Sequence, residues 1–244
     1  MNSEGKNKIN SIEQYNTIIH ELQQWFEKEE NDSWTNLSTG KNKQKRKTEL
    51  YSNPPRNGCV RTRCKVECSC PQNTIVNFNN IADEEQLKQY DNSMTHYKVL
   101  KEIAKETEIN GKKMEILIVD TGFKLPYLII SPRRFISIHI NYRDTDGSHV
   151  WIQGSMKAKD LEQLTNKTNK ESESSNMVLA EKRSGLRVKP VEGNDNVCSI
   201  ERIIEMNANG SIPTWVQDKA KTSEIERLTK LAELTESYYQ SNKK

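Results

Sequence analysis

The chain has 244 residues, enough for one large domain or two small ones and for a sizeable buried core. Its 37 Lys and Arg residues nearly balance 34 Asp and Glu residues, and the formal charge of +3 argues against a dedicated nucleic-acid-binding protein. No apolar run reaches the ~20 residues that a membrane-spanning helix needs. The polar segment 1–10 lacks the apolar stretch of a secretory signal. We therefore expect a cytoplasmic protein with no nucleic-acid partner and a disordered N-terminus over residues 1–10.

The five cysteines predict buried thiols rather than disulfides or a metal site. An odd number of cysteines in a cytoplasmic chain argues against a disulfide framework. The close spacing of Cys64, Cys68 and Cys70 would also suit a metal site, but the three share one parity of a strand with two valines and a threonine. Small thiols on an apolar strand face explain this pattern. We expect no metal and no cofactor.

The chain begins with a predicted helix and a basic segment. Ser11 is a suitable N-cap, and apolar residues at helical spacing continue to about Glu30. The basic segment 41–47 is interpreted as a solvated loop, with attraction to membrane headgroups and a localisation signal as alternatives.

The middle of the chain has the alternating pattern and the turn residues of an antiparallel sheet. Asn110–Gly111 marks a hairpin, and short helices are expected within 75–90. Ser184–Gly185 either separates two strands or bends one, and the polar segment 157–176 is expected to be a flexible excursion. Strands are predicted over residues 48–52, 60–70, 97–105, 114–120, 135–143, 149–156, 177–183, 186–192 and 198–206.

Two further segments complete the predicted architecture. Segment 122–130 carries Phe123, Leu125 and Tyr127 where a loop is expected, and an apolar loop needs something to cover it. The longest helical pattern runs from 212 to about 240, and its broad apolar face implies burial against a sheet. The sequence thus predicts a helix, antiparallel strands and a long C-terminal helix, without a second domain.

Three short motifs stand out. Segment 184–215 has two alternating runs around a turn, then Ile-Pro-Thr-Trp at 212–215 before the last helix. Ser-Pro-Arg-Arg-Phe at 131–135 leads into a strand, and Tyr-Asp at 90–91 precedes a strand that starts near Lys-Val-Leu at 98–100. In order and separation these motifs resemble those of the START domain, the steroidogenic-acute-regulatory-related lipid-transfer module.

The resemblance covers roughly residues 11–239 and implies a single domain over 11–240. The implied fold is an α+β helix-grip fold, in which a curved antiparallel β-sheet packs around a long C-terminal α-helix with an internal lipid cavity. The implied partners are a single lipid ligand and, transiently, a membrane surface, and the implied state is a monomer. In START domains the loop matching 122–130 lies over the cavity mouth, so Phe123, Leu125 and Tyr127 become candidate gate residues.

Two charged residues lie on otherwise apolar strand faces. Arg202 lies between two isoleucines of its face, and Glu181 follows apolar residues of its own parity. A charge on an inward face is costly unless it is paired, and a lipid cavity would use such groups to hold a headgroup. The alternative is that both side chains reach solvent at strand ends. Trp215 either lines the cavity or only packs the last helix onto the sheet.

The resemblance adds candidates near the end of the 75–90 segment. Asp91 matches an acidic residue that START lipid binders use in headgroup recognition. Gln89 matches a position that is acidic in sterol-binding members, and Tyr90 takes the place of a tryptophan. Members that bind phosphatidylcholine or ceramide carry an arginine four residues before the acid, where this chain has Leu87. The usual arginine–acid pair is therefore missing.

Further candidates lie on the central strands. His139 falls where sterol-binding members place a cavity arginine, and Gln153 and Arg202 fall near headgroup contacts of the ceramide-binding member. Strand parity alone would bury the isoleucines beside His139 and expose the histidine, whereas the resemblance turns it inward. We follow the resemblance and expect His139 in the cavity.

No catalytic pattern is found in the sequence. Its 4 histidines leave few options for a general base, and no nucleophile elbow, phosphate-binding loop or zinc-protease motif is present. We expect a non-enzymatic protein that sequesters one phospholipid, ceramide or sterol and exchanges it at membranes. One alternative is a lipid sensor without transfer activity. Another is an enzyme on the same scaffold, for which His139 with Glu181 is the available pair.

Overall fold

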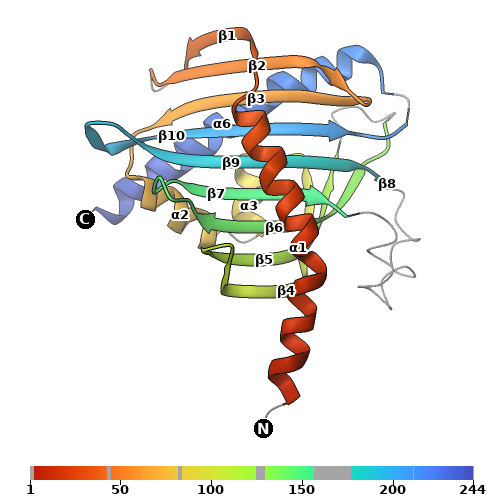
Figure 1. Cartoon of the computed structure of the whole chain (residues 1–244). Coiled ribbons are helices and arrows are strands. Elements are labelled where there is room, and N and C mark those ends of the chain that lie inside the picture. Colours follow the sequence, from red (N-terminus) through yellow and green to blue (C-terminus); the bar gives the residue numbers. More distant parts are fainter. Residues whose placement is uncertain are drawn as a thin grey trace.

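The computed structural model describes residues 3–42, 45–81, 84–124, 130–156, 177–210 and 212–243. Within these residues, a ten-stranded sheet lies between two long helices, α1 and α6 (Figure 1). The helices are α1 (Ser3–Glu30), α2 (Gln72–Ile81), α3 (Glu84–Tyr90) and α6 (Thr214–Asn242). The strands are β1 (Thr35–Lys41), β2 (Lys47–Arg56), β3 (Cys59–Cys68), β4 (Met94–Ile109), β5 (Lys112–Phe123), β6 (Arg133–Arg143), β7 (His149–Ser155), β8 (Val178–Leu179), β9 (Glu181–Val191) and β10 (Asn194–Asn207).

The sheet consists of three antiparallel runs of consecutive strands, β1–β3, β4–β7 and β9–β10, which are joined where β3 pairs with β10 and β7 pairs with β9. The strand order is β1-β2-β3-β10-β9-β7-β6-β5-β4, and the short β8 pairs in parallel with β6. Positive φ angles at Asn110 and Gly111 confirm the predicted hairpin. The β4–β5 pairing contains several register shifts, and such bulges bend a sheet. The α+β fold expected from the sequence, with a curved antiparallel sheet and a long C-terminal helix, is confirmed.

Helix α1 packs on one face of the sheet, which we call the outer face. Tyr15, Ile19 and Phe26 are almost fully buried there against a row of isoleucines from β5, β6 and β7. Gly154 and Gly185 allow the close approach, because a Cβ atom at either position would overlap Leu22 or Phe26.

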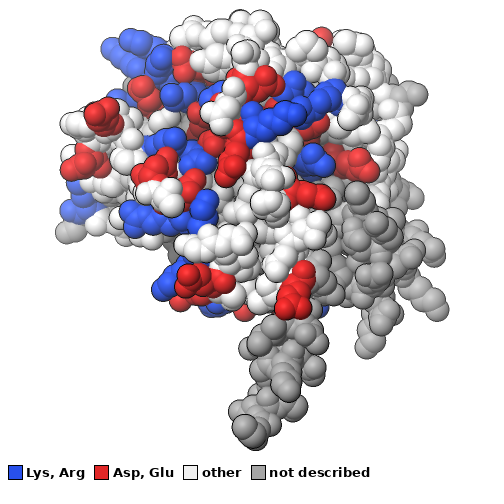
Figure 2. Space-filling view, viewed as in Figure 1, with Lys and Arg blue, Asp and Glu red and all other residues white. Residues whose placement is uncertain are grey.

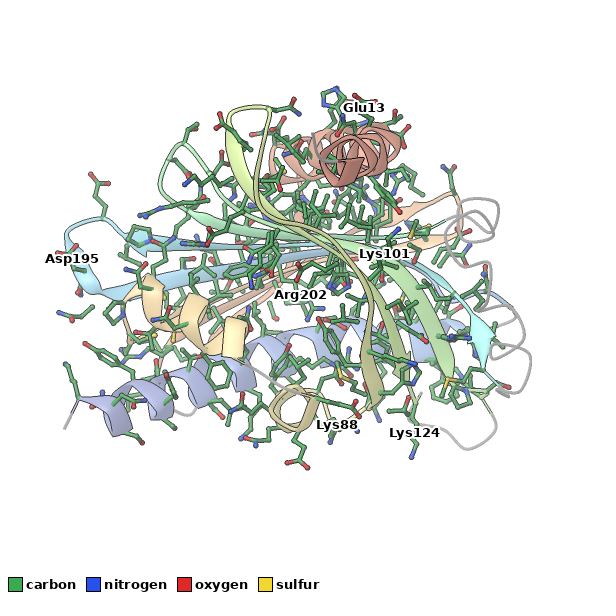
Figure 3. The ribbon with its side chains drawn as sticks, turned by 90° about the horizontal axis from the view of Figure 1, so that it is seen from below. Glu13, Lys88, Lys101, Lys124, Asp195 and Arg202 are labelled. Atoms are coloured by element: carbon green, nitrogen blue, oxygen red, sulfur yellow. The ribbon has the colours of Figure 1, made fainter. Side chains whose placement is uncertain are left out.

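Helix α6 covers the opposite, inner face (Figure 3). Its buried residues Leu228, Leu231 and Ala232 pack on β3 and β10, where Cys64, Cys68 and Cys198 lie among aliphatic side chains. Helix α2 adds Ile75 and Phe78 to the same core. The alternation predicted for the cysteine-bearing strand is therefore confirmed, with the thiols on the buried face.

Charged residues line the outer face beside the end of α1. The carboxylate of Glu29 is buried and pairs with Arg56 at 2.6 Å and with Arg61. Arg56 also reaches Glu205 at 3.0 Å, which accepts a hydrogen bond from the Trp25 indole at 2.7 Å. Figure 2 shows that acidic and basic side chains are interspersed over this side of the molecule. The pairing offsets the cost of burying charge beneath the helix.

Three segments can be compared with the sequence expectations. Helix α1 begins at Ser3, so the segment 3–10, where disorder was expected, is helical in the structure. A helix held by packing farther along can propagate through polar residues, because each added residue gains one backbone hydrogen bond. The described ends of the basic segment 41–47 agree with a solvated connection: β1 ends at Lys41, β2 begins at Lys47, and the Asn42 N–H donates to the Arg46 carbonyl. Of the two alternatives at Ser184–Gly185, the structure has the single strand, since β9 runs through both residues.

The expected excursion at 157–176 lies outside the described residues. No helix in the described part of the chain has the length and apolar character required of a membrane span.

Candidate functional site

Polar side chains form a row across the inner face of the sheet. His139 on β6 pairs with Gln153 on β7, which pairs with Ser184 on β9. Their neighbours of opposite parity, such as Ile138 and Ile152, point to the outer face and enter the core beneath α1. The isoleucines are buried beneath α1, and His139 on the inner face is partly buried. The expectation that His139 turns inward agrees with this placement.

Five charged residues meet between this row and the helices; we call them the interior charge cluster. They are Asp91, Lys182, Arg202, Glu224 and Arg227. The Arg227 Nε atom lies 3.2 Å from Asp91 Oδ1, and its guanidinium also contacts Glu224. Arg202 lies 3.5 Å from the other oxygen of Glu224 and donates to Ser184 Oγ at 3.4 Å. Figure 3 shows Arg202 between the sheet and α6.

The Asp91–Arg227 pair answers a question that the sequence raised. Leu87 stands where an arginine would accompany the acid, and it is buried in α3. The cation comes instead from Arg227 on α6, which also donates to Ser93 Oγ at 3.1 Å. The acidic group therefore has a cationic partner, and this partner ties α6 to the end of α3.

Lys182 is the exceptional member of the cluster. It is only 9% exposed, and its Nζ lies 5.2 and 5.1 Å from the ring centres of Phe123 and Phe135. No described carboxylate lies within ion-pair distance of Nζ, although both arginines of the cluster have one. Burial and the positive charge of Arg202 lower the pKa of Lys182 to about 7, against a smaller opposing effect of Glu224 and Asp91.

His139 is a second polar residue whose side chain has a ring nitrogen without a described hydrogen-bond partner. Its ring packs edge-on to Tyr97 at 6.3 Å, and Nε2 is buried without a hydrogen-bond partner in the described structure. Burial, with a contribution from the Lys182 charge, lowers the pKa of His139 to about 3. The imidazole is therefore neutral at physiological pH. Ser137, one inward position along β6, also has a buried Oγ without such a partner.

Helix α6 packs less closely over this region than at its end. Between Val216 and Leu228 its side chains are at most partly buried, whereas the last turns pack firmly on β3. Tyr97 and His139 on the inner face are also partly buried, and burial raises the pKa of Tyr97 and lowers that of His139.

The other predicted site residues divide into two groups. Tyr90 is half-buried against the α6 core, and burial raises its pKa to about 12. Phe123 is half-buried at the end of β5, with its ring centre 5.8 Å from that of Phe135. Leu125 and Tyr127 lie outside the described residues. The structure does not bring the remaining three to the cluster: Gln89 and Glu181 are exposed, and Trp215 is 52% exposed at the start of α6.

The sequence analysis missed Lys182, Glu224 and Arg227. Lys182 shares the parity of Ser184, Leu186 and Val188, and that signal could have identified it as inward in place of Glu181. The two α6 residues carry no comparable signal, because charges flanking an apolar helical stripe ordinarily face solvent.

Three cysteines form a separate cluster on the inner face. The Sγ atoms of Cys68, Cys70 and Cys198 all lie within 4.8 Å of one another, and those of Cys68 and Cys70 are 3.3 Å apart. Hydrogen bonds from Cys198 and Cys68 lower the pKa of Cys70 to about 4. Three sulfur donors could hold a soft ion such as Zn²⁺ or Cu⁺, a possibility that the sequence analysis set aside in favour of buried thiols.

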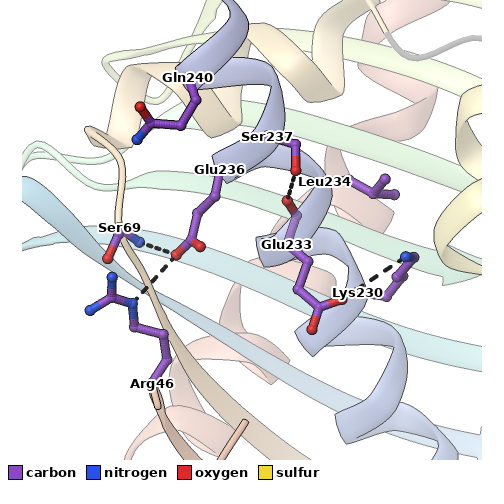
Figure 4. A pocket seen from close by; sticks show the side chains of 8 residues that line it. All are labelled: Arg46, Ser69, Lys230, Glu233, Leu234, Glu236, Ser237 and Gln240. Carbon is purple, nitrogen blue, oxygen red and sulfur yellow. Dashed lines mark hydrogen bonds and ion pairs between the residues drawn. The ribbon is translucent and has the colours of Figure 1, made fainter. Parts of the chain in front are cut away.

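A surface hollow of about 460 Å³ lies on another side of α6 (Figure 4). Glu236 crosses it, accepting a hydrogen bond from the Ser69 backbone and pairing with Arg46 at 3.6 Å. None of the interior charge cluster lines it.

No protein-family model and no curated protein sequence matches the chain. Solved structures do resemble it. Human StAR-related lipid transfer protein 5 superposes with a TM-score of 0.67 at 12% identity, covering 91% of this chain and 97% of that one. Human STARD10 gives 0.65 at 14% identity, over 90% and 80% of the two chains. The lipid transfer and protein localization domain of human StarD13 gives 0.59 at 15%, over 88% and 95%. The chain has the helix-grip fold of START domains.

Proposed function

We propose that this protein binds one lipid between the inner face of the sheet and α6, and carries it between membranes as a cytoplasmic monomer. The observation that supports this proposal most is that Ser137 Oγ and His139 Nε2 are buried without described partners on the inner face, which is covered by α6, a helix whose side chains between Val216 and Leu228 are only partly buried. Enclosing the apolar part of a lipid yields ~25 cal/mol for each Å² removed from water, which makes a monomeric lipid soluble. The polar row of the sheet would then orient the headgroup.

Exchange requires the lipid to pass a movable element. The segment 122–130 that carries Phe123, Leu125 and Tyr127 remains the candidate gate, together with the first half of α6. Phe123 lies next to Lys182 at the end of β5, so it would border the path of the headgroup. Opening at a membrane surface would be a gating motion without chemistry.

The enzymatic alternative loses its proposed pair. His139 faces the interior, whereas Glu181 is exposed on a strand position of opposite parity to Lys182. A general base and its partner must lie within hydrogen-bonding reach, which these two positions do not provide. The sensor alternative keeps the same binding site and differs only in whether the lipid is released to a second membrane.

The proposal is tested by filling the interior. Gln153→Trp places a large ring on the inner face, and Gln89→Trp places the same ring on the exposed surface of α3 as a matched control. Native mass spectrometry of each protein, purified from a eukaryotic lysate, would report any retained lipid. We expect one lipid in the wild type and the control, and its loss in Gln153→Trp at unchanged folding.

A vesicle-to-vesicle assay with a fluorescent lipid then separates transfer from sensing. Transfer by the wild type and by Gln89→Trp, but not by Gln153→Trp, supports the proposal. A wild type that retains lipid without transferring it would favour the sensor. A wild type that neither carries nor takes up lipid would overturn lipid binding itself.

A further inference from the structure

The interior charge cluster has an excess of positive charge. Arg202 and Arg227 are each paired with a carboxylate of Glu224 or Asp91, so the two acids are already engaged. Lys182 is the third cation and pairs with neither. A buried ammonium group without a counter-charge is costly, and its lowered pKa has the same origin.

The aromatic rings beside Lys182 offset only part of the cost of burying its charge. A cation over an aromatic face gains far less than an ammonium–anion pair with its hydrogen bonds. Phe123 and Phe135 therefore contact the ammonium group of Lys182 without neutralising its charge. The three N–H groups of this ammonium have no described hydrogen-bond acceptor.

Two more unpartnered polar atoms lie on β6, on the same face as Lys182 and separated from its strand by β7. Ser137 Oγ and His139 Nε2 are buried without partners within the described residues. On β7, the Ser155 hydroxyl accepts the backbone N–H of Lys182, which fixes β9 next to this position. Ser137 pairs with Ser155 across β6 and β7, so the serine and the lysine flank one strand. We call Ser137, His139 and Lys182 the polar patch.

The patch has the properties of a preformed anion site. It offers one cation and two neutral groups that can donate, the hydroxyl of Ser137 and the neutral imidazole of His139 in its Nε2–H form. A neutral hydroxyl headgroup would leave the ammonium group unpaired. A phosphate or carboxylate group would supply both the missing charge and the missing acceptors.

We propose that the bound lipid has a headgroup of net negative charge, a phosphate or a carboxylate without a cation of its own, whose charge is neutralised by Lys182 and whose oxygens accept hydrogen bonds from Ser137 and His139. The choline cation of phosphatidylcholine would instead add positive charge to a cluster that already has an excess of it. This inference rests on the proposed lipid-binding function and adds the chemical class of the ligand. The apolar part of the lipid would extend between the sheet and the part of α6 between Val216 and Leu228.

The decisive experiment compares lipid uptake by matched lysine variants. Lys182→Met removes the buried charge and keeps the length of the side chain. Lys189→Met makes the same change on the same strand, where the residue is exposed. Delipidated proteins are incubated with vesicles of phosphatidylcholine alone, with added phosphatidic acid, or with added oleic acid, and the bound lipid is identified by native mass spectrometry.

We expect the wild type and Lys189→Met to prefer acidic lipid over phosphatidylcholine by about tenfold or more, and Lys182→Met to lose that preference. Uptake of phosphatidic acid but not oleic acid would identify a phosphate, and the reverse a carboxylate. Ser137→Ala, which perturbs the fold least, should weaken the preference by about threefold through the loss of one hydrogen bond.

The failures are distinguishable. A wild type that takes up phosphatidylcholine and acidic lipids equally, or a Lys182→Met variant that keeps the preference, overturns this inference and leaves lipid binding intact. A wild type that takes up nothing from any vesicle overturns both. Melting temperatures measured in parallel identify loss of binding through unfolding, which we do not expect because Lys182→Met removes an unpaired buried charge.

Discussion

The two faces of the sheet are built on different principles. Beneath α1, large apolar side chains interlock, Phe26 rests directly on the backbone of Gly185, and buried charges such as Glu29 have two partners. On the inner face, polar groups are buried without described partners, and between Val216 and Leu228 the side chains of α6 are at most partly buried. The first arrangement stabilises the fold. The second leaves buried polar atoms without hydrogen-bond partners, as expected where a bound ligand supplies those partners.

The largest expected effect lies on the outer face. Phe26→Ala should lower the free energy of unfolding by ~3–5 kcal/mol, because it removes a fully buried ring and leaves a cavity above Gly185. Urea denaturation measures the change. Lipid uptake by the fraction that remains folded should be unaltered. A decrease in the free energy of unfolding below ~1 kcal/mol would contradict the close packing of α1 on the outer face.

A smaller loss is expected at the contact between the inner face and α6. Arg227→Met leaves Asp91 without its cation and should cost ~2 kcal/mol, less than for a fully buried pair because the arginine is partly exposed. Lys230→Met is the control, since Lys230 is half-exposed on the same helix. Chemical denaturation of both variants gives the comparison, and equal losses would contradict the role of the Asp91 pair.

At Lys182 we expect a substitution to stabilise the protein rather than destabilise it. Lys182→Met should raise the free energy of unfolding by on the order of 1 kcal/mol near neutral pH. The folded pKa of Lys182 is about 7, below the ~10.4 of an unfolded chain, so its penalty is complete below pH about 7 and disappears towards pH ~10. The advantage of the variant over the wild type should therefore shrink as the pH rises from 7 to 10. An advantage that is constant over this range would contradict burial of the charge.

The smallest effect on stability concerns the cysteines. Cys59 is half-buried, while Cys64, Cys68, Cys70 and Cys198 are fully buried. In the native protein we expect one thiol to react quickly with a maleimide, as counted by intact mass, and Cys59→Ser to remove that reaction at a cost within ~0.5 kcal/mol. Rapid labelling of a second thiol would show that the α6 side opens more readily than its packing indicates.

Much of the fold could be predicted from local patterns. Alternating strands, the Asn110–Gly111 hairpin and the long final helix each follow from residue spacing that neighbouring segments do not override. Strand β1 was missed because it is exposed along its whole length and Leu37 is its one large apolar residue, so no alternation marks it. Its strand conformation comes from hydrogen bonding to β2, which a local pattern does not record.

The site was harder to predict because both faces of the sheet are covered. On β6, parity separates the isoleucines from His139 but does not say which set faces α6, since Ser137 on the inner face is as buried as the isoleucines on the outer face. On β9, the choice of Glu181 over Lys182 failed for a related reason: the strand begins later than expected, and the inward set is the one that continues into Ser184. The pairing of Asp91 with Arg227 joins positions far apart in the chain, which no local pattern contains.

The sheet is open, and its two outermost strands have consequences for solubility. Strands β1 and β4 lie at opposite ends of the strand order, each with one hydrogen-bonding edge that no described strand covers. A free edge invites pairing with a second molecule. The bulges of β4 make that edge irregular, and its exposed charged side chains, among them Lys98, Lys101 and Glu102, favour solvent over a second strand. The features that curve the sheet around its interior thus also protect the protein against aggregation.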